Sequence, residues 1–128
     1  MSYAPSAHAA TDTVSGSLWG GEGSNTWVFY TTQRYHSKSQ PLTFWLKTAY
    51  DPCGGGNLFI RPLRSNGNWM ASAHYWGLGS GTNNLNSTRH WGQAGTIAAG
   101  NFTLAASTNT YCGVPPPSKT TFSGGITY

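Results

Sequence analysis

Carboxylate side chains limit what this sequence of 128 residues can catalyse, because it contains only three of them, Asp12, Glu22 and Asp51. Glycoside hydrolysis needs a pair of carboxyl groups that flank the bond to be cleaved. Asp12 belongs to an N-terminal stretch of small residues, and Glu22 and Asp51 stand in glycine-rich turns, where acids usually hydrogen-bond the turn backbone. The sequence therefore predicts no catalytic pair of carboxylates.

Histidines offer a second route to catalysis. His36, His74 and His90 are separated by 38 and 16 positions. Together they would make a metal site or, with Glu22 and an arginine, an acid–base set of the kind that cleaves RNA. Neither spacing is that of a zinc motif, and the sequence has no G-x-S-x-G nucleophile elbow. We expect no catalytic residue, metal or cofactor, and a small secreted histidine-based hydrolase, nuclease or toxin is the alternative.

Two cysteines, Cys53 and Cys112, lie 59 positions apart. A single pair without C-x-x-C spacing favours one structural disulfide, and disulfides persist in oxidising compartments. The sequence Ala7-His8-Ala9 has the A-x-A pattern that precedes signal-peptidase cleavage, although no charged or apolar leader stands before it. The sequence thus predicts a secreted protein with one disulfide. Two buried free thiols are the other interpretation.

Charge is scarce in this chain. Seven basic and three acidic side chains give a net charge of +4. Nucleic-acid binding needs clustered lysines and arginines to neutralise phosphates, whereas the basic residues here are scattered singly. No apolar run approaches the length of about 18 residues that a membrane-spanning helix needs. These features argue against a nucleic-acid partner and against a membrane span.

The sequence contains six tryptophans, seven tyrosines and five phenylalanines. Tryptophan is rarely fully buried, so a domain of this size should expose several of these rings. Exposed aromatic rings beside amides and hydroxyls suit sugars, and Trp, Tyr and Arg also dominate protein contacts. Trp19 and Trp27 are interpreted as core residues, and the opposing interpretation places all six tryptophans in the core. The candidate binding residues are Trp45, on the polar face of its strand, and a group around a long loop: His74, Trp76, Asn83, Asn84, Arg89, His90 and Trp91.

Apolar and polar residues alternate over short segments between clusters of Gly, Pro, Asn and Ser, and no window shows helical spacing. Within 42–48, alternation puts Leu42, Phe44 and Leu46 on one face and Trp45 on the other. The pair Asn66-Gly67 predicts a hairpin that joins two of the expected strands. The strands are expected within 14–19, 26–35, 42–48, 58–64, 69–76, 96–105 (as two strands joined by a turn) and 122–128.

Residues 77–87 are expected to form a long Gly/Asn/Ser loop, where binding groups often gather, and 115–117 a short polyproline spacer. The expected fold class is all-β: a single antiparallel β-sandwich of jelly-roll or Ig-like type over residues 12–128, with a small barrel as the second choice. Residues 1–11 are expected to be a flexible arm or a leader remnant.

The expected function is that of a secreted non-catalytic binding or adaptor domain. It would engage an extracellular protein or a glycan through exposed aromatic residues and the Asn-rich loop. A protein is slightly favoured, because a small-residue arm or a free sheet edge can add to another protein's sheet. The alternatives are the enzyme or toxin described above and a subunit of a secreted multi-protein complex.

Overall fold

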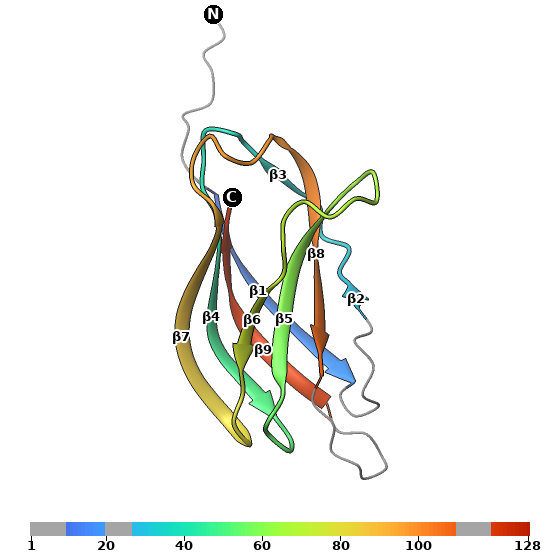
Figure 1. Cartoon of the computed structure of the whole chain (residues 1–128), viewed down its shortest axis with the longest axis vertical. Helices are drawn as coiled ribbons and strands as arrows, with labels where there is room; N and C mark the ends of the chain where they lie inside the picture. The colour runs from blue at the N-terminus through green and yellow to red at the C-terminus, as the bar shows by residue number, and fades with distance from the viewer. Residues whose placement is uncertain (1–9, 20–26, 110–118) are drawn as a thin grey trace, which may run out of the picture.

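Two antiparallel β-sheets that pack face to face make up the fold (Figure 1). The computed structural model describes residues 10–19, 27–109 and 119–128, and these residues contain no helix. The predicted all-β antiparallel sandwich is confirmed, and the sheets do not close into a barrel over the described ranges. The strands are β1 (Thr11–Trp19), β2 (Val28–Phe29), β3 (Arg34–His36), β4 (Leu42–Asp51), β5 (Asn57–Arg64), β6 (His74–Gly77), β7 (Gly81–Gly92), β8 (Gly100–Thr108) and β9 (Lys119–Thr127).

The strand order brings together segments that are far apart in the chain. The first sheet has the order β1-β9-β4-β7, and in the second sheet β2 and β3 both pair with β8, which is followed by β5 and β6. The edges of the first sheet are therefore β1 and β7. In Figure 1, β7 lies at the left of the sandwich, β2 lies at the right, and β3 crosses near the top.

Apolar side chains at alternate positions along the strands fill the space between the sheets. In β4, Leu42, Phe44 and Leu46 are buried, whereas Trp45 and Lys47 are exposed, as the sequence predicts. Each large apolar side chain buried in this way stabilises the fold by about 1.5 to 3 kcal/mol. The core consists of Leu18, Leu42, Phe44, Leu46, Ala49, Leu58, Ile60, Met70, Trp76, Leu78, Phe102, Leu104, Ala106, Phe122 and Ile126.

The loop predicted over residues 77–87 is wrong. Only its beginning is irregular, and β7 runs from Gly81 along β4. Asparagine is a poor strand former, but strand preference depends on context. Here Asn84 and Asn86 are exposed to solvent, and β7 pairs with β4 from Gly81 to Gly92 with bulges beside Leu42 and Leu46. This tertiary pairing outweighs the local preference of the asparagines.

The predicted hairpin is confirmed, although it is less regular than expected. β5 pairs with β6, and the turn contains Gly67 with a φ of 89°. Between the turn and β6, only Leu63 and Trp69 form an isolated bridge. Two other expected strands differ: the one within 26–35 is divided into β2 and β3, and residues 96–99 precede β8 without forming a strand.

Asp51 organises the turn after β4. Its buried carboxylate accepts the backbone N–H groups of Cys53 (3.1 Å) and Gly54 (3.0 Å), so the predicted turn role of this acid is confirmed. We expect Asp51→Ala to lower the free energy of unfolding by about 1 to 3 kcal/mol, because two backbone donors lose their acceptor. Urea unfolding measures this loss. Asp51→Asn keeps one acceptor oxygen and should cost less, and equal losses in both variants would contradict the assignment.

Several features of the sequence lie outside the described residues. The predicted disulfide therefore remains a prediction, and so does the role of Glu22. The features concerned are the A-x-A pattern at 7–9, Glu22, Cys112, the polyproline spacer at 115–117 and the side chain of Trp19.

The described N-terminal residues belong to the first sheet. β1 begins at Thr11, the last residue assigned to the arm, and Ala10 exchanges two backbone hydrogen bonds with Tyr128 (3.0 and 2.9 Å). Over the described part of the chain, no helix has the length and hydropathy of a membrane span.

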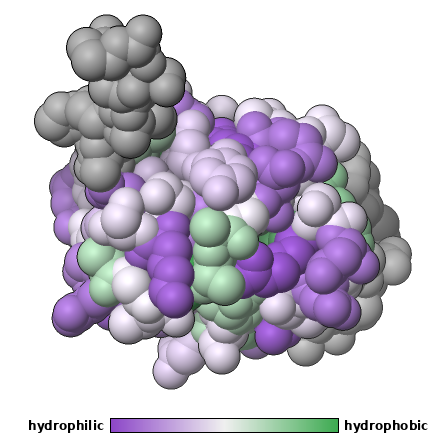
Figure 2. Space-filling view, turned by 90° about the horizontal axis from the view of Figure 1, so that it is seen from above, coloured by the Kyte–Doolittle hydropathy of each residue, from purple (hydrophilic) through white to green (hydrophobic). Residues whose placement is uncertain are grey.

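The end of the sandwich near β3 is built from polar turns. Gln40 N–H donates to Ser37 O (3.0 Å), and Gly95 N–H donates to Lys38 O (2.6 Å). Figure 2 shows this end, where hydrophilic and neutral residues cover most of the visible surface and hydrophobic residues form a narrow strip. We therefore look for the binding surface on the sheet faces and edges.

Candidate binding site

The outer face of the four-stranded sheet carries hydroxyl and amide side chains around one tryptophan. Residues that pair across an antiparallel ladder point to the same side of the sheet. Trp45 pairs with Thr88 of β7 and with Gly125 of β9, which in turn pairs with Thr13 of β1. We call this surface the Trp45 face. Each of its four rows contains one residue from β1, β9, β4 and β7, in that order. The rows are Thr11, Thr127, Thr43 and His90; Thr13, Gly125, Trp45 and Thr88; Ser15, Ser123, Thr48 and Asn84; and Ser17, Thr121, Tyr50 and Thr82.

Trp45 lies at the centre of this face. Its side chain is 40% exposed, and a Cβ added at Gly125 would lie 3.7 Å from a ring carbon of Trp45. The indole therefore lies over Gly125 at ordinary contact distance while part of the ring remains open to solvent. Tyr50, five positions along β4, is also exposed. A bulge between Leu46 and Thr48 lies between them, so Trp45 and Tyr50 pair with Gly125 and Thr121 of β9, which are four residues apart. At about 3.3 Å per residue, the two positions are about 13 Å apart along the sheet.

Polar groups on the Trp45 face are mostly uncharged. The hydroxyl oxygens of Thr11 and Thr127 lie 3.3 Å apart, and those of Thr48 and Ser123 lie 3.0 Å apart, so neighbouring hydroxyls hydrogen-bond across the strands. Neither of the two described acids lies on this face, since Asp51 is buried at the end of β4 and Asp12 pairs with Arg34 of the other sheet. Lys47, exposed at the β4 bulge between Leu46 and Thr48, adds one positive charge near this face. The face therefore offers mostly neutral donors and acceptors beside aromatic rings.

The structure places three of the eight predicted binding residues on this face, namely Trp45, Asn84 and His90. Asn83 instead holds the turn before β7. Its Oδ1 accepts the N–H of Gly79 (2.8 Å), and its Nδ2 donates to the carbonyl oxygens of Gly79 (2.8 Å) and Gly81 (3.1 Å). The amide of Asn83 is therefore occupied by the backbone of this chain.

His74 and Trp91 join the two sheets where their edge strands β6 and β7 face each other. His74 Nε2 donates to the backbone oxygen of His90 (2.7 Å), and the His74 ring lies 5.5 Å from that of Trp91. Trp91 also packs against Phe44 of the core at 6.2 Å. These contacts close this side of the sandwich.

Trp76 must be corrected from a binding residue to a core residue. Its side chain is only 2% exposed and packs against Phe44 with the ring centroids 5.7 Å apart. The guanidinium of Arg89, another predicted binding residue, lies 5.8 Å from the Trp76 ring centroid. No face of the Trp76 ring is open to a partner. Alternation along β6 explains why Trp76 is a core residue and not a binding residue, because Tyr75 points outward and Trp76 points inward.

The three histidines considered for catalysis do not converge. His36 is fully buried in β3, where its Nε2 donates to Ile97 O (3.2 Å), whereas His74 and His90 lie at the β6–β7 side. Among the residues that the structure describes, no group of three His, Cys, Asp or Glu side chains could hold a metal ion. The described geometry offers the histidine-based alternative no common site.

The pKa values of His36 and Asp12 are both lowered. Burial lowers the pKa of His36 below its ordinary value of 6.5, and the charge of Arg64 lowers it further. Hydrogen bonds lower the pKa of Asp12 below 3.8: the Tyr128 hydroxyl donates to its Oδ2 at 2.7 Å, and Arg34 Nε donates at 3.0 Å.

We expect the free energy of unfolding to decrease in two steps as the pH falls. The unfolded chain accepts a proton at His36 more readily than the folded chain, so the free energy of unfolding decreases as the pH falls through about 6.5. Ionised Asp12 stabilises the fold above its unfolded pKa, and this stabilisation disappears below about pH 4 as the folded carboxylate is protonated. Urea midpoints measured across this range test both steps. His36→Gln should flatten the first step and Asp12→Asn the second, and a first step unchanged by His36→Gln would refute its assignment.

A second aromatic cluster lies on the outer face of the five-stranded sheet, where the sequence analysis did not expect one. Trp69 lies 5.1 Å from Trp27 and 6.2 Å from Phe29, and the Arg61 guanidinium lies 4.4 Å from its ring centroid. We call these four residues the Trp69 cluster. They surround Ala105 of β8, which faces outward and is nevertheless fully buried. Trp27, interpreted from the sequence as a core residue, thus belongs to an outer layer that covers the sheet.

The sequence gives only a weak signal for the Trp69 cluster. Alternation along β5 does place Arg61 outward, because Ile60 and Pro62 are buried. The pairing of Phe29 and Arg61 with opposite sides of Ala105 depends on the strand order, which local patterns do not reveal.

Comparisons with known proteins identify no relative of this chain. No protein-family model matches the sequence, and no curated protein or solved structure matches it either. The function must therefore be argued from the surfaces of the β-sandwich itself.

Proposed function

We propose that this protein is a secreted non-catalytic binding domain that binds a glycan on the Trp45 face. One observation carries the proposal: the exposed Trp45 ring lies against Gly125 at the centre of a surface made mostly of uncharged hydroxyl and amide groups. Asn84 and His90, which the sequence analysis also selected, lie on the same face.

A sugar ring presents both chemistries that this face supplies. Its C–H groups form an apolar surface that can pack on an indole, and its hydroxyls both donate and accept hydrogen bonds. Trp45 and Tyr50 lie on one strand about 13 Å apart, a separation that suits an extended oligosaccharide better than a single sugar. The ligand class that fits best is therefore a neutral, extended polysaccharide.

The Trp69 cluster fits a glycan less well. One face of Trp69 is taken by Arg61, and Phe29 stacks near the ring with an angle of 25° between the planes. A sugar would have to displace one of these contacts. Trp, Tyr and Arg side chains packed together are more typical of protein contacts, so a protein partner would be expected at this cluster rather than on the Trp45 face.

Co-sedimentation with insoluble polysaccharides tests the proposal. The folded protein is mixed with microcrystalline cellulose, chitin or an insoluble β-1,3-glucan, and the unbound fraction is measured. We expect saturable depletion by at least one of these neutral polymers that survives high salt, because no ion pair is involved. Absence of binding to all three, or binding that salt abolishes, would count against the proposal.

The proposal of a secreted location rests in part on a Cys53–Cys112 disulfide, because disulfides persist in oxidising compartments. We expect the intact mass of the protein to rise by about 2 Da when it is reduced under denaturing conditions. Loss of the bridge should lower the free energy of unfolding by about 4 kcal/mol, because the unfolded chain is no longer constrained. An unchanged mass on reduction would remove the bridge and this argument for secretion.

A further inference from the structure

The outer edge of β1 is the first element of an additional binding site. β1 lies at the edge of its sheet, and no described segment pairs with its outer side. Ala10 and Tyr128 exchange two backbone hydrogen bonds, and the ladder with β9 continues along all of β1 without a bulge. Hydrogen-bonded pairs alternate in an antiparallel ladder, so every second residue, including Thr13 and Ser15, directs its N–H and C=O away from β9. A regular edge of this kind is a template for a further strand.

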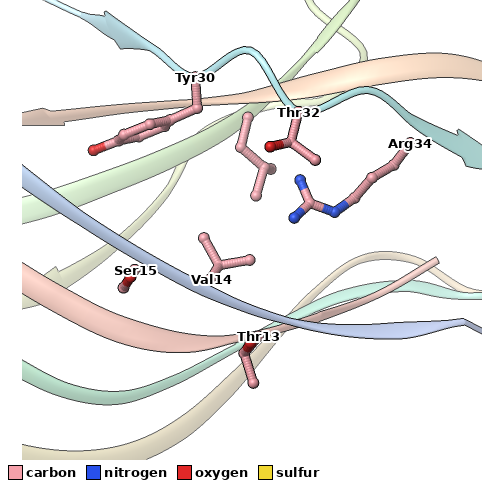
Figure 3. Close-up of a pocket in the computed structure, with 7 residues that line it drawn as sticks. Thr13, Val14, Ser15, Tyr30, Thr32 and Arg34 are labelled. Carbon is pink, nitrogen blue, oxygen red and sulfur yellow. The ribbon is translucent and has the colours of Figure 1, made fainter.

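A cavity of about 220 Å³ lies beside this edge, between β1 and residues 30–34 of the other sheet (Figure 3). Val14 and Leu104 contribute apolar walls, and Thr32 and Arg34 contribute polar ones. Figure 3 shows the two terminal nitrogens of Arg34 directed into the space between Thr32 and Val14. On the opposite side of the sandwich, His74 of β6 instead bridges to the backbone of β7 through its hydrogen bond to His90 O.

Arg34 gives the cavity its chemical character. Its side chain is 8% exposed, and its Nε donates to Oδ2 of Asp12 at 3.0 Å. A guanidinium has five N–H donors, of which this bond uses one, and the donors on the terminal nitrogens face the cavity. Tyr30 also lines the cavity, and Figure 3 shows its hydroxyl directed away from Arg34. A bound carboxylate would supply acceptors to the terminal donors of Arg34.

We propose that an extended segment of a partner protein adds to β1 as a further strand and that an acidic side chain of this segment enters the cavity and pairs with Arg34. Backbone hydrogen bonds to Thr13 and Ser15 would hold the segment, and alternation would turn every second side chain toward the cavity. The volume is sufficient, since a cavity of about 150 Å³ already holds a benzene ring. The net charge of +4 favours an acidic partner. This interaction goes beyond the proposed glycan site and does not depend on it.

Hydrogen exchange of the free protein provides the first test. The amide hydrogens of Thr13 and Ser15 should exchange rapidly, whereas those of Val14 and Gly16, which face β9, should be protected. Protection of Thr13 and Ser15 in the free protein would show that another part of this chain already occupies the edge. That result would overturn the proposal of a partner segment.

Peptide titration of the ¹⁵N-labelled full chain provides the second test. The probe is a short peptide of alternating threonine and valine with a central glutamate, and its control has glutamine at the centre. We expect saturable shifts at Thr13 and Ser15, and about tenfold weaker binding of the glutamine peptide because the charge-assisted bond to Arg34 is lost. No binding at millimolar peptide, or equal binding of both peptides, would overturn the proposal.

A matched pair of variants separates strand addition from other modes of binding. Ser15→Pro removes an outward N–H without breaking a hydrogen bond to β9, so it should abolish peptide binding, whereas Ser15→Ala should bind like the wild type. Unfolding midpoints confirm that both variants are folded. If Ser15→Pro does not fold, a peptide N-methylated at the amides that face β1 replaces it. Retained binding in either experiment would overturn the proposal.

Discussion

Trp45→Ala should weaken polysaccharide binding about thirtyfold and leave the domain folded. A sugar ring that packs on the exposed side of the indole removes about 80 Å² of apolar surface from water, which at about 25 cal/mol per Å² amounts to about 2 kcal/mol. The loss of stability should stay near about 1 kcal/mol, because the ring lies on the surface of the sheet. Co-sedimentation isotherms and urea unfolding of the same preparations measure the two quantities.

Tyr75→Ala is the matched control for this variant. Tyr75 is 60% exposed and lies on β6, in the other sheet. Its removal deletes an exposed aromatic ring of similar accessibility without touching the Trp45 face, so binding should remain that of the wild type. Equal losses in Trp45→Ala and Tyr75→Ala would point to nonspecific hydrophobic adsorption and would contradict the proposed site.

Trp76→Ala should have the largest effect on stability. The indole is almost fully buried against Phe44, and its removal leaves a cavity between the sheets. Substitutions of this type lower the free energy of unfolding by about 3 to 5 kcal/mol. Because small domains are stable by only about 5 to 15 kcal/mol, a large part of the total would be lost. Urea unfolding followed by circular dichroism measures the change.

Variants of Trp76 test whether this side chain packs the core or contacts the ligand. Trp76→Phe retains an aromatic ring in the core and should lose clearly less stability than Trp76→Ala. At temperatures where it is folded, Trp76→Ala should still bind polysaccharide. A variant that kept the wild-type unfolding midpoint but lost binding would show that Trp76 is a ligand contact and that our correction is mistaken.

The sandwich could be predicted because alternation is a local property of the chain. Leu42, Phe44 and Leu46 show on their own which side of β4 meets the core, and the Asn66-Gly67 pair marks a turn. β7 could not be predicted in this way. Its Asn-rich sequence has the local features of a loop, and it becomes a strand only because β4 lies beside it.

The candidate site could be predicted only in part, for a related physical reason. Trp45 was selected because its strand has an apolar face and a polar one, and its exposure agrees with that argument. The residues around it come from four strands whose order is β1-β9-β4-β7, and no local pattern shows that Gly125 lies beneath the indole. Trp76 was selected for its residue type, and the direction of its side chain in β6 makes it part of the core.

Chemical-shift mapping with a soluble oligosaccharide tests the central claim most directly. The ¹⁵N-labelled protein is titrated with a neutral oligosaccharide from the polymer that depletes it best in co-sedimentation. Our account predicts saturable shifts of the Trp45 indole N–H and of the amides of Tyr50, Asn84 and Thr88. Shifts confined to Trp69 and Tyr75 on the opposite sheet, or no shifts at any oligosaccharide concentration, would contradict it.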